Sequence, residues 1–423
     1  MNKLNPNDVA EEIKRNHNLI FLEGKFFLYE NGVYSEISNA EVASLIKKQL
    51  GHNYSVHLRN EVTACLTADT FIRFDELITP SFLINLKNGY LNIEKFELLP
   101  HADVCHFTSQ IDCDYAPAAE CPKWRQFLTE TFEGDESKVL ILQEFVGYIL
   151  SPLTNFEKAL LLLGQGANGK SVILNVIRGL LGDRNCSSVP LEQFNNKNYL
   201  AEFFGKMVNV STESNTRGQI YESSFKQLVS GETVTADRKY GHPFQFKNTC
   251  KLAFAFNDTP RINDKSDAVY RRLIPIYFNH QVPEGQQNKA LAYELLLERS
   301  GILNWAIEGL KRLRAQNEFT KSESVLQVLL DYKKENNNVM CFAEECCVTA
   351  TGLRLTKKSL YDAYKEFCKD NNYHPLSMNK FGKQLVRVAP TVTDFKTAKA
   401  RCWEGISLIE LATTDNDADG RLL

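Results

Sequence analysis

The sequence predicts an α/β fold, with a core built on a parallel sheet, an α+β N-terminal region and a winged-helix-like C-terminal domain. Three observations predict this fold. An apolar strand, a glycine-rich loop and an amphipathic helix follow one another in LLLLGQGANGKSVILNVIRGLLG, residues 160–182. Strand and helix patterns then alternate to about Phe278, as in βαβ units. Towards the C-terminus, an amphipathic helix, a basic helix and a basic hairpin occur in winged-helix order.

The glycine-rich loop has the pattern of a phosphate-binding P-loop. It matches G-x-x-x-x-G-K-[ST] between a strand and a helix, which is the context that this pattern requires. Backbone N–H groups in such a loop turn towards phosphate oxygens at the positive end of the helix. Lys170 would reach the β- and γ-phosphates, and Ser171 would hold Mg²⁺. The alternative is a chance glycine-rich turn. The predicted nucleotide-binding residues are Gly164, Gln165, Gly166, Ala167, Asn168, Gly169, Lys170 and Ser171.

Composition bounds the class of protein. The 423 residues are enough for two or three domains. Hydrophobic residues make up 43% and charged residues 24%, which is typical of a soluble globular chain. No apolar run approaches the roughly 20 residues of a membrane span, and the N-terminus lacks the apolar segment of a signal peptide. We therefore expect a cytoplasmic protein without membrane partners; a bacterial host is an expectation that comes only from the family resemblance given below. The 11 cysteines are scattered and form no C-x-x-C pair, so neither a disulfide framework nor a zinc site is expected.

The pattern of elements divides the chain. We expect hairpins around Asn31-Gly32 and Asn88-Gly89, a helix over 39–50, and two helices over 124–151 that are broken at Gly134-Asp135. Two further helices are expected near 288–299 and 301–315. The predicted parts are an α+β region (1–110), a helical segment (111–152), an ATPase domain (153–315), a C-terminal winged-helix-like domain (325–412) and a disordered tail (413–423).

Two polar residues follow apolar strands beyond the P-loop. Glu213 comes directly after the strand around Val208 and Val210, and Asn257 ends the buried run KLAFAFN. A carboxylate at the end of a neighbouring strand is placed to act on Mg²⁺ and on the attacking water. An amide at the next strand end can orient that water against the γ-phosphate. The alternative for Glu213 is a solvated loop residue.

Basic residues mark two further places in this region. A hairpin over 233–246 has the tip DRKYGH, where Arg238, Lys239 and His242 suit contact with phosphates. The pair Arg271 and Arg272 precedes another apolar strand, and an arginine that reaches a neighbouring subunit's nucleotide is worth about 10³–10⁵ in rate. Taken alone, the tip is more often a solvated turn and the arginine pair a surface pair.

This ordered set resembles the superfamily 3 helicases, and in particular the helicase part of phage and plasmid primase-helicases, which are related to the poxvirus primase-helicase. The resemblance also covers LKNGYLNIEKFELLPH, DYAPAAECPKW and LQEFVGYILSP upstream of the P-loop. It implies an AAA+-like ATPase that forms a hexameric ring on single-stranded DNA and unwinds duplex in the 3′→5′ direction. ATP and Mg²⁺ would be its cofactors, and forked DNA its substrate.

The resemblance also implies roles for single residues. Lys170 and Ser171 would bind phosphate and Mg²⁺, and Glu213 would be the acid of the second nucleotide motif, with a share in the metal site. Asn257 would sense the γ-phosphate. Lys239 and His242 would track DNA, and Arg271 or Arg272 would be the arginine finger. Many relatives carry two adjacent acids where this chain has Glu213 followed by Ser214, so Mg²⁺ would depend more on Ser171 and water.

The C-terminal part carries a local excess of basic residues that the net charge of −3 conceals. Its second helix and its hairpin supply the predicted DNA-binding residues Lys380, Lys383, Arg387, Lys396 and Lys399. This arrangement is also similar to the C-terminal domain of the same family. A small packing domain with a solvated basic face is the alternative.

The whole pattern favours a replicative DNA helicase of a mobile element. Little more than one hundred residues precede the helicase-associated part, so we expect no primase domain and a separate primase as partner. A P-loop ATPase that acts as an initiator or loader switch, without processive unwinding, is the alternative. DNA-stimulated turnover with strand separation would distinguish the two.

Overall fold

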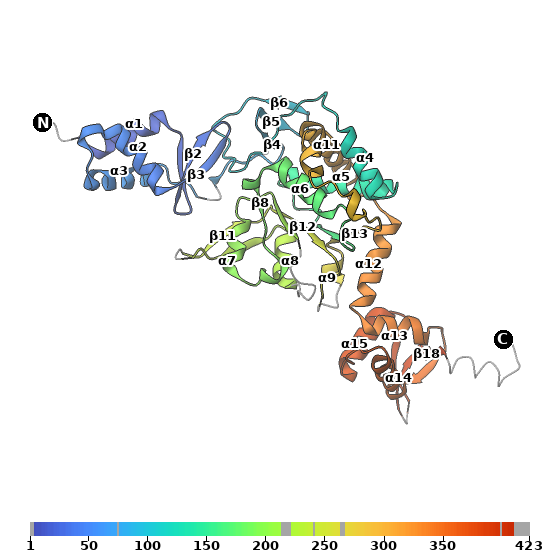
Figure 1. The fold of residues 1–423 in the computed structure, drawn as a ribbon. Helices are drawn as coiled ribbons and strands as arrows, with labels where there is room; N and C mark the ends of the chain where they lie inside the picture. The colour runs from blue at the N-terminus through green and yellow to red at the C-terminus, as the bar shows by residue number, and fades with distance from the viewer. Residues whose placement is uncertain are drawn as a thin grey trace, which may run out of the picture. The chain divides into compact units, whose positions relative to one another are not determined.

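The computed structural model describes residues 4–73, 76–212, 221–239, 242–262, 267–397 and 400–409 (Figure 1). The chain divides into two compact units. The larger unit contains residues 1–260 and 271–326, and the smaller unit contains residues 261–270 and 327–423. Glu213, Lys399 and the predicted tail at 413–423 lie outside the described residues.

The larger unit begins with three helices and a three-stranded antiparallel sheet. Their bounds are α1 Pro6–Asn16, β1 Leu19–Leu22, β2 Lys25–Glu30, β3 Val33–Ile37, α2 Asn39–Leu50 and α3 Val56–Asp69. The helix predicted over 39–50 is confirmed. Ser38 caps it and forms a capping box with Glu41. The turn at Asn31-Gly32 is also confirmed, since both residues have positive φ and Glu30 pairs with Val33, as a two-residue hairpin turn requires.

A second antiparallel sheet corrects the other predicted turn. Its strands are β4 Leu83–Leu86, β5 Gly89–Asn92 and β6 Glu97–Leu99. Leu86 pairs with Gly89, so the turn residues are Lys87 and Asn88 rather than Asn88-Gly89. Gly89 is already in the strand with φ +149, where a Cβ would clash with the carbonyl oxygen of Leu99. The glycine therefore marks the close approach of β6, not the turn.

A five-stranded parallel sheet forms the centre of the larger unit. Its strands are β7 Ala159–Leu163, β8 Cys186–Ser187, β9 Val208–Thr212, β12 Lys251–Phe256 and β13 Leu273–Tyr277. They lie in the order β13-β7-β12-β9-β8, and each neighbouring pair is parallel. Every residue of β7 and β12 is buried, which is typical of strands covered on both faces. The predicted α/β class with a parallel sheet is confirmed.

Helices and one hairpin complete the larger unit. Their bounds are α4 Pro122–Thr131, α5 Glu136–Leu150, α6 Lys170–Leu181, α7 Lys197–Leu200, α8 Glu222–Val229, β10 Thr233–Ala236, β11 Phe244–Lys247, α10 Leu291–Leu296 and α11 Arg299–Gln316. The predicted break between α4 and α5 is confirmed, and the Asp135 side chain caps α5. The boundary between the last two helices lies earlier than predicted, since α11 already begins at Arg299.

Helices α5 and α11 pack side by side at very short range (Figure 1). A Cβ on Gly309 would clash with the carbonyl oxygen of Gln143, and one on Gly147 would clash with the backbone of Ala306 and Leu310. Trp124 and Trp305 stack edge to face beside this contact, with ring centroids 5.5 Å apart. The two glycines therefore set the distance between the helices that cover the sheet.

We expect Gly309→Ala to lower the free energy of unfolding by about 1–3 kcal/mol, the usual cost of overpacking a core. Gly285→Ala is the matched control, because a Cβ there meets no atom within 4 Å. Urea denaturation of the two variants measures the difference. Equal midpoints for both would contradict the close helix contact.

The smaller unit has the element order predicted for the C-terminal domain. Helix α12 (Glu323–Glu335) contains the boundary between the units. The remaining elements are α13 Asn338–Cys346, β14 Cys347–Val348, β15 Arg354–Thr356, α14 Lys357–Asp370, α15 Met378–Val388, β16 Thr393–Lys396, β17 Arg401–Glu404 and β18 Ser407–Leu408. Strands β15, β17 and β16 form one antiparallel sheet in that order, and β14 pairs with β18. The aromatic side chains of Phe342, Tyr364 and Phe381 pack at the centre.

The smaller unit also includes a segment that we expected in the ATPase domain. Residues 261–270 belong to this unit, and α9 (Asp267–Tyr270) lies within this range. Tyr270 packs against Tyr332 with ring centroids 5.7 Å apart, and the Asp267 carboxylate lies 2.7 Å from the Lys333 amine. The loop between β12 and β13 is therefore attached to the smaller unit. In the described part of the chain, no helix combines the length and the apolar character needed to cross a membrane.

Candidate nucleotide site

The glycine-rich loop that matches the P-loop pattern, residues 164–169, lies between β7 and α6, as the sequence predicts; we refer to it as the P-loop. Gly164, Ala167 and Gly169 have φ values of 134°, 59° and 90°, so the loop turns through left-handed conformations. A Cβ on Gly164 would lie 2.6 Å from the carbonyl oxygen of Phe278, which explains that glycine. A Cβ on Gly166 would meet no atom within 4 Å, so Gly166 faces open space instead of a packing constraint.

Lys170 is the first residue of α6 and is 5% exposed. Its Nζ donates to the carbonyl oxygens of Gly164 and Gln165 and, at 3.0 Å, to Oδ1 of Asn168. These acceptors hold the ammonium inside the loop. Gly169 precedes it and provides no side-chain cap, and the N-terminal end of a helix carries a positive partial charge that favours an anion.

Asn168 is a buried loop residue with an incomplete set of hydrogen bonds. It is 3% exposed, and its Nδ2 has no partner among the described residues. Because Lys170 only donates, the amide oxygen must face Lys170 and the NH₂ group must face elsewhere. A buried amide donor without an acceptor is costly, and a phosphate oxygen would be a suitable acceptor.

A cavity of about 530 Å³ opens beside this loop. Its walls come from the P-loop, from Thr212 at the end of β9, from Asn257 after β12, from α4, and from the segment 280–291 after β13. These places share the carboxyl edge of the parallel sheet. After β7 the chain crosses to β8 at one edge of the sheet, whereas after β12 it crosses to β13 at the opposite edge. The cavity lies where these two connections diverge, which is a topological switch point of the sheet.

The residues around the cavity fit a nucleoside triphosphate with Mg²⁺. Lys170, the N–H groups at the start of α6 and the Asn168 amide provide donors for phosphate oxygens. The hydroxyl groups of Ser171 and Thr212 provide the oxygen ligands that Mg²⁺ prefers. Glu213, the predicted acid, follows Thr212 directly but lies outside the described residues. Asn257 lines the cavity with an exposed side chain, and its role stays a prediction.

The two arginines predicted as finger candidates lie at the amino ends of the strands, at the other end of the sheet from the cavity. They precede β13, and the carbonyl oxygen of Arg272 accepts from the N–H of Ala159 at the start of β7. Strands of this length span about 16 Å, so neither arginine reaches the cavity of its own chain.

The structure separates these two arginines. The Arg272 guanidinium is 7% exposed and lies 2.8 Å from the Glu157 carboxylate and 2.9 Å from Oγ of Ser230. Arg271 is exposed. Burial, reinforced by the charges of both arginines, lowers the pKa of Lys158 beside them. The two finger candidates therefore differ, because Arg272 is held by its own chain whereas Arg271 is exposed; which of them acts as a finger stays a prediction.

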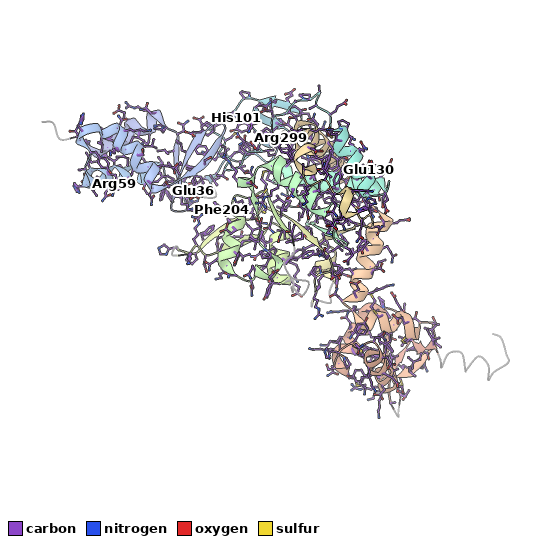
Figure 2. All side chains as sticks on the ribbon, viewed as in Figure 1. Glu36, Arg59, His101, Glu130, Phe204 and Arg299 are labelled. Carbon is purple, nitrogen blue, oxygen red and sulfur yellow. The ribbon has the colours of Figure 1, made fainter. Side chains whose placement is uncertain are left out.

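The hairpin of β10 and β11 divides its predicted DNA-binding residues in a similar way. Lys239 and His242 are exposed. Arg238 is not at a free tip, since its guanidinium lies over the rings of Phe244 at 4.6 Å and Phe204 at 5.8 Å. It also donates to the carbonyl oxygen of Glu23 at 3.2 Å. Phe204 is labelled in Figure 2. Arg238 therefore connects the hairpin to the β1–β2 turn.

The predicted basic residues of the smaller unit share one exposed helix face. Lys380, Lys383 and Arg387 are exposed on α15, while Phe381 and Leu385 of the same helix are buried. Lys396, at the end of β16, is also exposed. Lys399 lies outside the described residues.

Several cavity residues were not predicted from the sequence. They are Phe127, Glu130 and Thr131 of α4, together with Thr212, His280, Val282 and Lys289. Figure 2 labels Glu130 on α4. Thr212 could have been found, because it ends an apolar strand next to Glu213. The α4 residues carry no motif and are brought to the loop only by the packing of α4.

Family models match three parts of the chain. Residues 7–133 match the D5 N terminal like model, residues 334–415 match the Poxvirus D5 protein-like model, and residues 162–272 match a family of unknown function, DUF5906. The protein named "Putative helicase L207/L206" of Acanthamoeba polyphaga mimivirus is 29% identical over 154 residues. That match covers 32% of this chain and 15% of the viral protein.

Solved structures share the fold across the chain. An apo structure of the NrS-1 C terminal region has a TM-score of 0.58 at 12% identity, covering 96% of this chain and 100% of that one. A second NrS-1 structure has a TM-score of 0.57. The sequence matches therefore make the N-terminal and C-terminal parts of the chain similar to D5-type proteins, and the solved structures, at 12% identity, show a shared fold.

Proposed function

We propose that the chain is the motor part of an ATP-dependent DNA helicase with an AAA+-like core, acting in the replication of a mobile element. The observation that carries this proposal is the cavity of about 530 Å³ at the carboxyl edge of the parallel sheet, with Lys170 and the start of α6 at its centre. The D5-type sequence matches on both sides of this core support a replication role. The 3′→5′ direction, the hexameric ring and a separate primase follow from the resemblance to superfamily 3 helicases.

In this proposal, a small set of residues acts on bound ATP. Lys170 would exchange the loop carbonyl oxygens for the β- and γ-phosphates, and Ser171 would hold Mg²⁺, which would supply positive charge beside the phosphates. Asn257 orients the attacking water, and Glu213 polarises it. Arg271 completes the site of a neighbouring subunit, which is the arrangement that its distance from its own cavity favours.

The strands that precede and follow the hairpin in the sequence both lead to residues that line the cavity. Strand β9, which precedes it, ends at Thr212, and β12, which follows it, leads to Asn257; both residues line the cavity. Asn248, between β11 and β12, is buried and donates to the carbonyl oxygens of Leu228 and Cys250 at 2.8 and 3.1 Å. The base of the hairpin is thus held firmly, and a shift at either strand end would move the exposed Lys239 and His242.

We expect the double replacement of Lys239 and His242 by Ala to spare ATP binding and assembly but to abolish unwinding. Lys239 would grip the DNA backbone by charge, and His242 would add a hydrogen bond or stacking. A forked-duplex unwinding assay, run beside DNA-stimulated ATPase, tests this. Lys226→Ala on α8 is a control of equal charge change outside the hairpin.

That same experiment separates the helicase from the alternative switch. A loader or initiator that uses ATP only for assembly would show no strand separation in the unaltered chain. A double variant that unwinds at the unaltered rate would instead show that this hairpin is not the motor's contact with DNA. The exposed basic face of α15 supports a second DNA contact in the smaller unit, in keeping with a winged-helix domain.

A further inference from the structure

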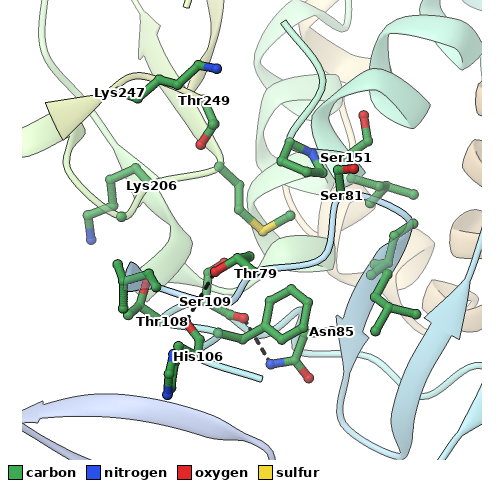
Figure 3. A pocket seen from close by; sticks show the side chains of 18 of the residues that line it. Thr79, Ser81, Asn85, His106, Thr108, Ser109, Ser151, Lys206, Lys247 and Thr249 are labelled. Carbon is green, nitrogen blue, oxygen red and sulfur yellow. Dashed lines mark hydrogen bonds between the residues drawn. The ribbon is translucent and has the colours of Figure 1, made fainter. Parts of the chain in front are cut away.

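A second cavity, of about 380 Å³, lies in the larger unit away from the P-loop (Figure 3). Its walls come from five stretches of the chain. They are residues 77–85, which include part of β4, residues 106–109, residues 149–154 at the end of α5, residues 203–207 before β9, and residues 246–249 at the end of β11. No residue of the nucleotide site described above lines it.

The wall of this cavity has an unusual chemical character. Among the described residues that line it are two lysines, Lys206 and Lys247, but no Asp or Glu. Hydroxyl groups come from Thr79, Ser81 and Ser151, among others, and Figure 3 labels the side chains of Ser81 and Ser151 in the wall. The Lys206 amine also donates to the carbonyl oxygen of Arg184, and the Ser151 hydroxyl to that of Tyr148. A hollow lined by lysines and hydroxyl groups, with no carboxylate among its described residues, attracts an anion.

A third amine stands directly behind this wall. Lys251 is 3% exposed, and its Nζ donates at 2.7 Å to the carbonyl oxygens of Ser151 and of Thr249, both of which line the cavity. Its amine also lies 4.6 Å from the centre of the Tyr148 ring. Burial lowers the pKa of Lys251 to about 7. A negative charge in the cavity would favour the ammonium form and so be bound more tightly.

We propose that this cavity is a second ligand site, and that it binds a phosphate group carried by a nucleotide or by a nucleic-acid strand. The volume of the cavity is within the range of small-ligand pockets. Lys247 is the last residue of β11 and is exposed, so it places a positive charge at the entrance of the cavity. Of the phenylalanine rings in the wall, Phe107, Phe203 and Phe246 are buried in the core, and the half-buried Phe204 packs edge to face on Phe246 and lies under the Arg238 guanidinium. The site therefore recognises phosphate and hydroxyl groups rather than stacking a base.

Two variants change the cavity in independent ways. Ser81→Phe fills the hollow without changing charge, and Lys247→Gln removes a charge without changing volume greatly. Lys48→Gln, on the exposed face of α2, is the matched control for loss of one surface charge. Thermal unfolding of each variant checks that the fold is kept.

Equilibrium dialysis with ADP and fluorescence anisotropy with a labelled oligothymidylate distinguish the two sources of phosphate. If the ligand is a nucleotide, the unaltered chain binds one more molar equivalent of ADP than Ser81→Phe. If the ligand is a strand, Ser81→Phe and Lys247→Gln bind the oligonucleotide about tenfold more weakly than the unaltered chain. This factor corresponds to the loss of one charge-assisted hydrogen bond. Lys48→Gln binds the oligonucleotide as tightly as the unaltered chain. Equal ADP stoichiometry and equal strand affinity in all four proteins would overturn the proposal. These assays report binding only, so they stand even if the chain does not hydrolyse ATP.

Discussion

Replacing Lys170 by Ala is expected to reduce ATP hydrolysis by at least about 10²–10³, the effect of removing one donor to charge that develops in the transition state. The amine faces the loop and the cavity rather than the apolar core, since its bonds go to Gly164, Gln165 and Asn168. The variant should therefore fold, with a melting temperature close to that of the unaltered chain. Phosphate release measures turnover, and nucleotide dialysis measures binding.

The matched control for this variant is Lys289→Ala. Lys289 also lines the cavity, but it is exposed and lies on the segment after β13, so its loss should change turnover far less. If Lys170→Ala keeps near-normal turnover, or if both variants lose activity equally, the P-loop assignment of Lys170 is wrong.

Replacing Arg271 by Ala is expected to lower turnover by about 10³–10⁵, as loss of an arginine finger does, without a measurable loss of stability. Arg272→Ala should behave in the opposite manner. It removes the ion pair with Glu157 and the bonds to Ser230, so we expect the free energy of unfolding to fall by about 1–3 kcal/mol. ATPase assays and urea denaturation of both variants, side by side, measure this contrast.

Mixing variants tests whether Arg271 acts between subunits. Chains with Lys170→Ala and chains with Arg271→Ala are each expected to be inactive alone. A mixture should regain part of the activity, because some interfaces then combine an intact P-loop with an intact finger. No recovery on mixing, or full turnover by Arg271→Ala alone, would rule out a finger in trans.

The sequence by itself determined the local parts of the site. The P-loop, its strand and its helix are specified by contiguous residues, because strand and helix periodicity and the conformations of Gly164 and Gly169 are local properties. The capped start of α2 and the turn at Asn31-Gly32 were predictable for the same reason. The Asn88-Gly89 prediction was wrong because Gly89 meets the carbonyl oxygen of Leu99, a contact that turn propensity does not contain.

Only the tertiary structure decided which of these residues act together. The order of the strands brings Thr212 and Asn257 to the P-loop and leaves Arg271 at the far edge of the sheet. Arg272 forms an ion pair with Glu157, which is more than one hundred residues away in the chain. Arg238 donates to the carbonyl oxygen of Glu23 and lies over two aromatic rings. The sequence identifies a basic residue but not its partner. Because the partner is brought close by contacts between segments that are distant in the sequence, only the folded structure decides the role of each arginine.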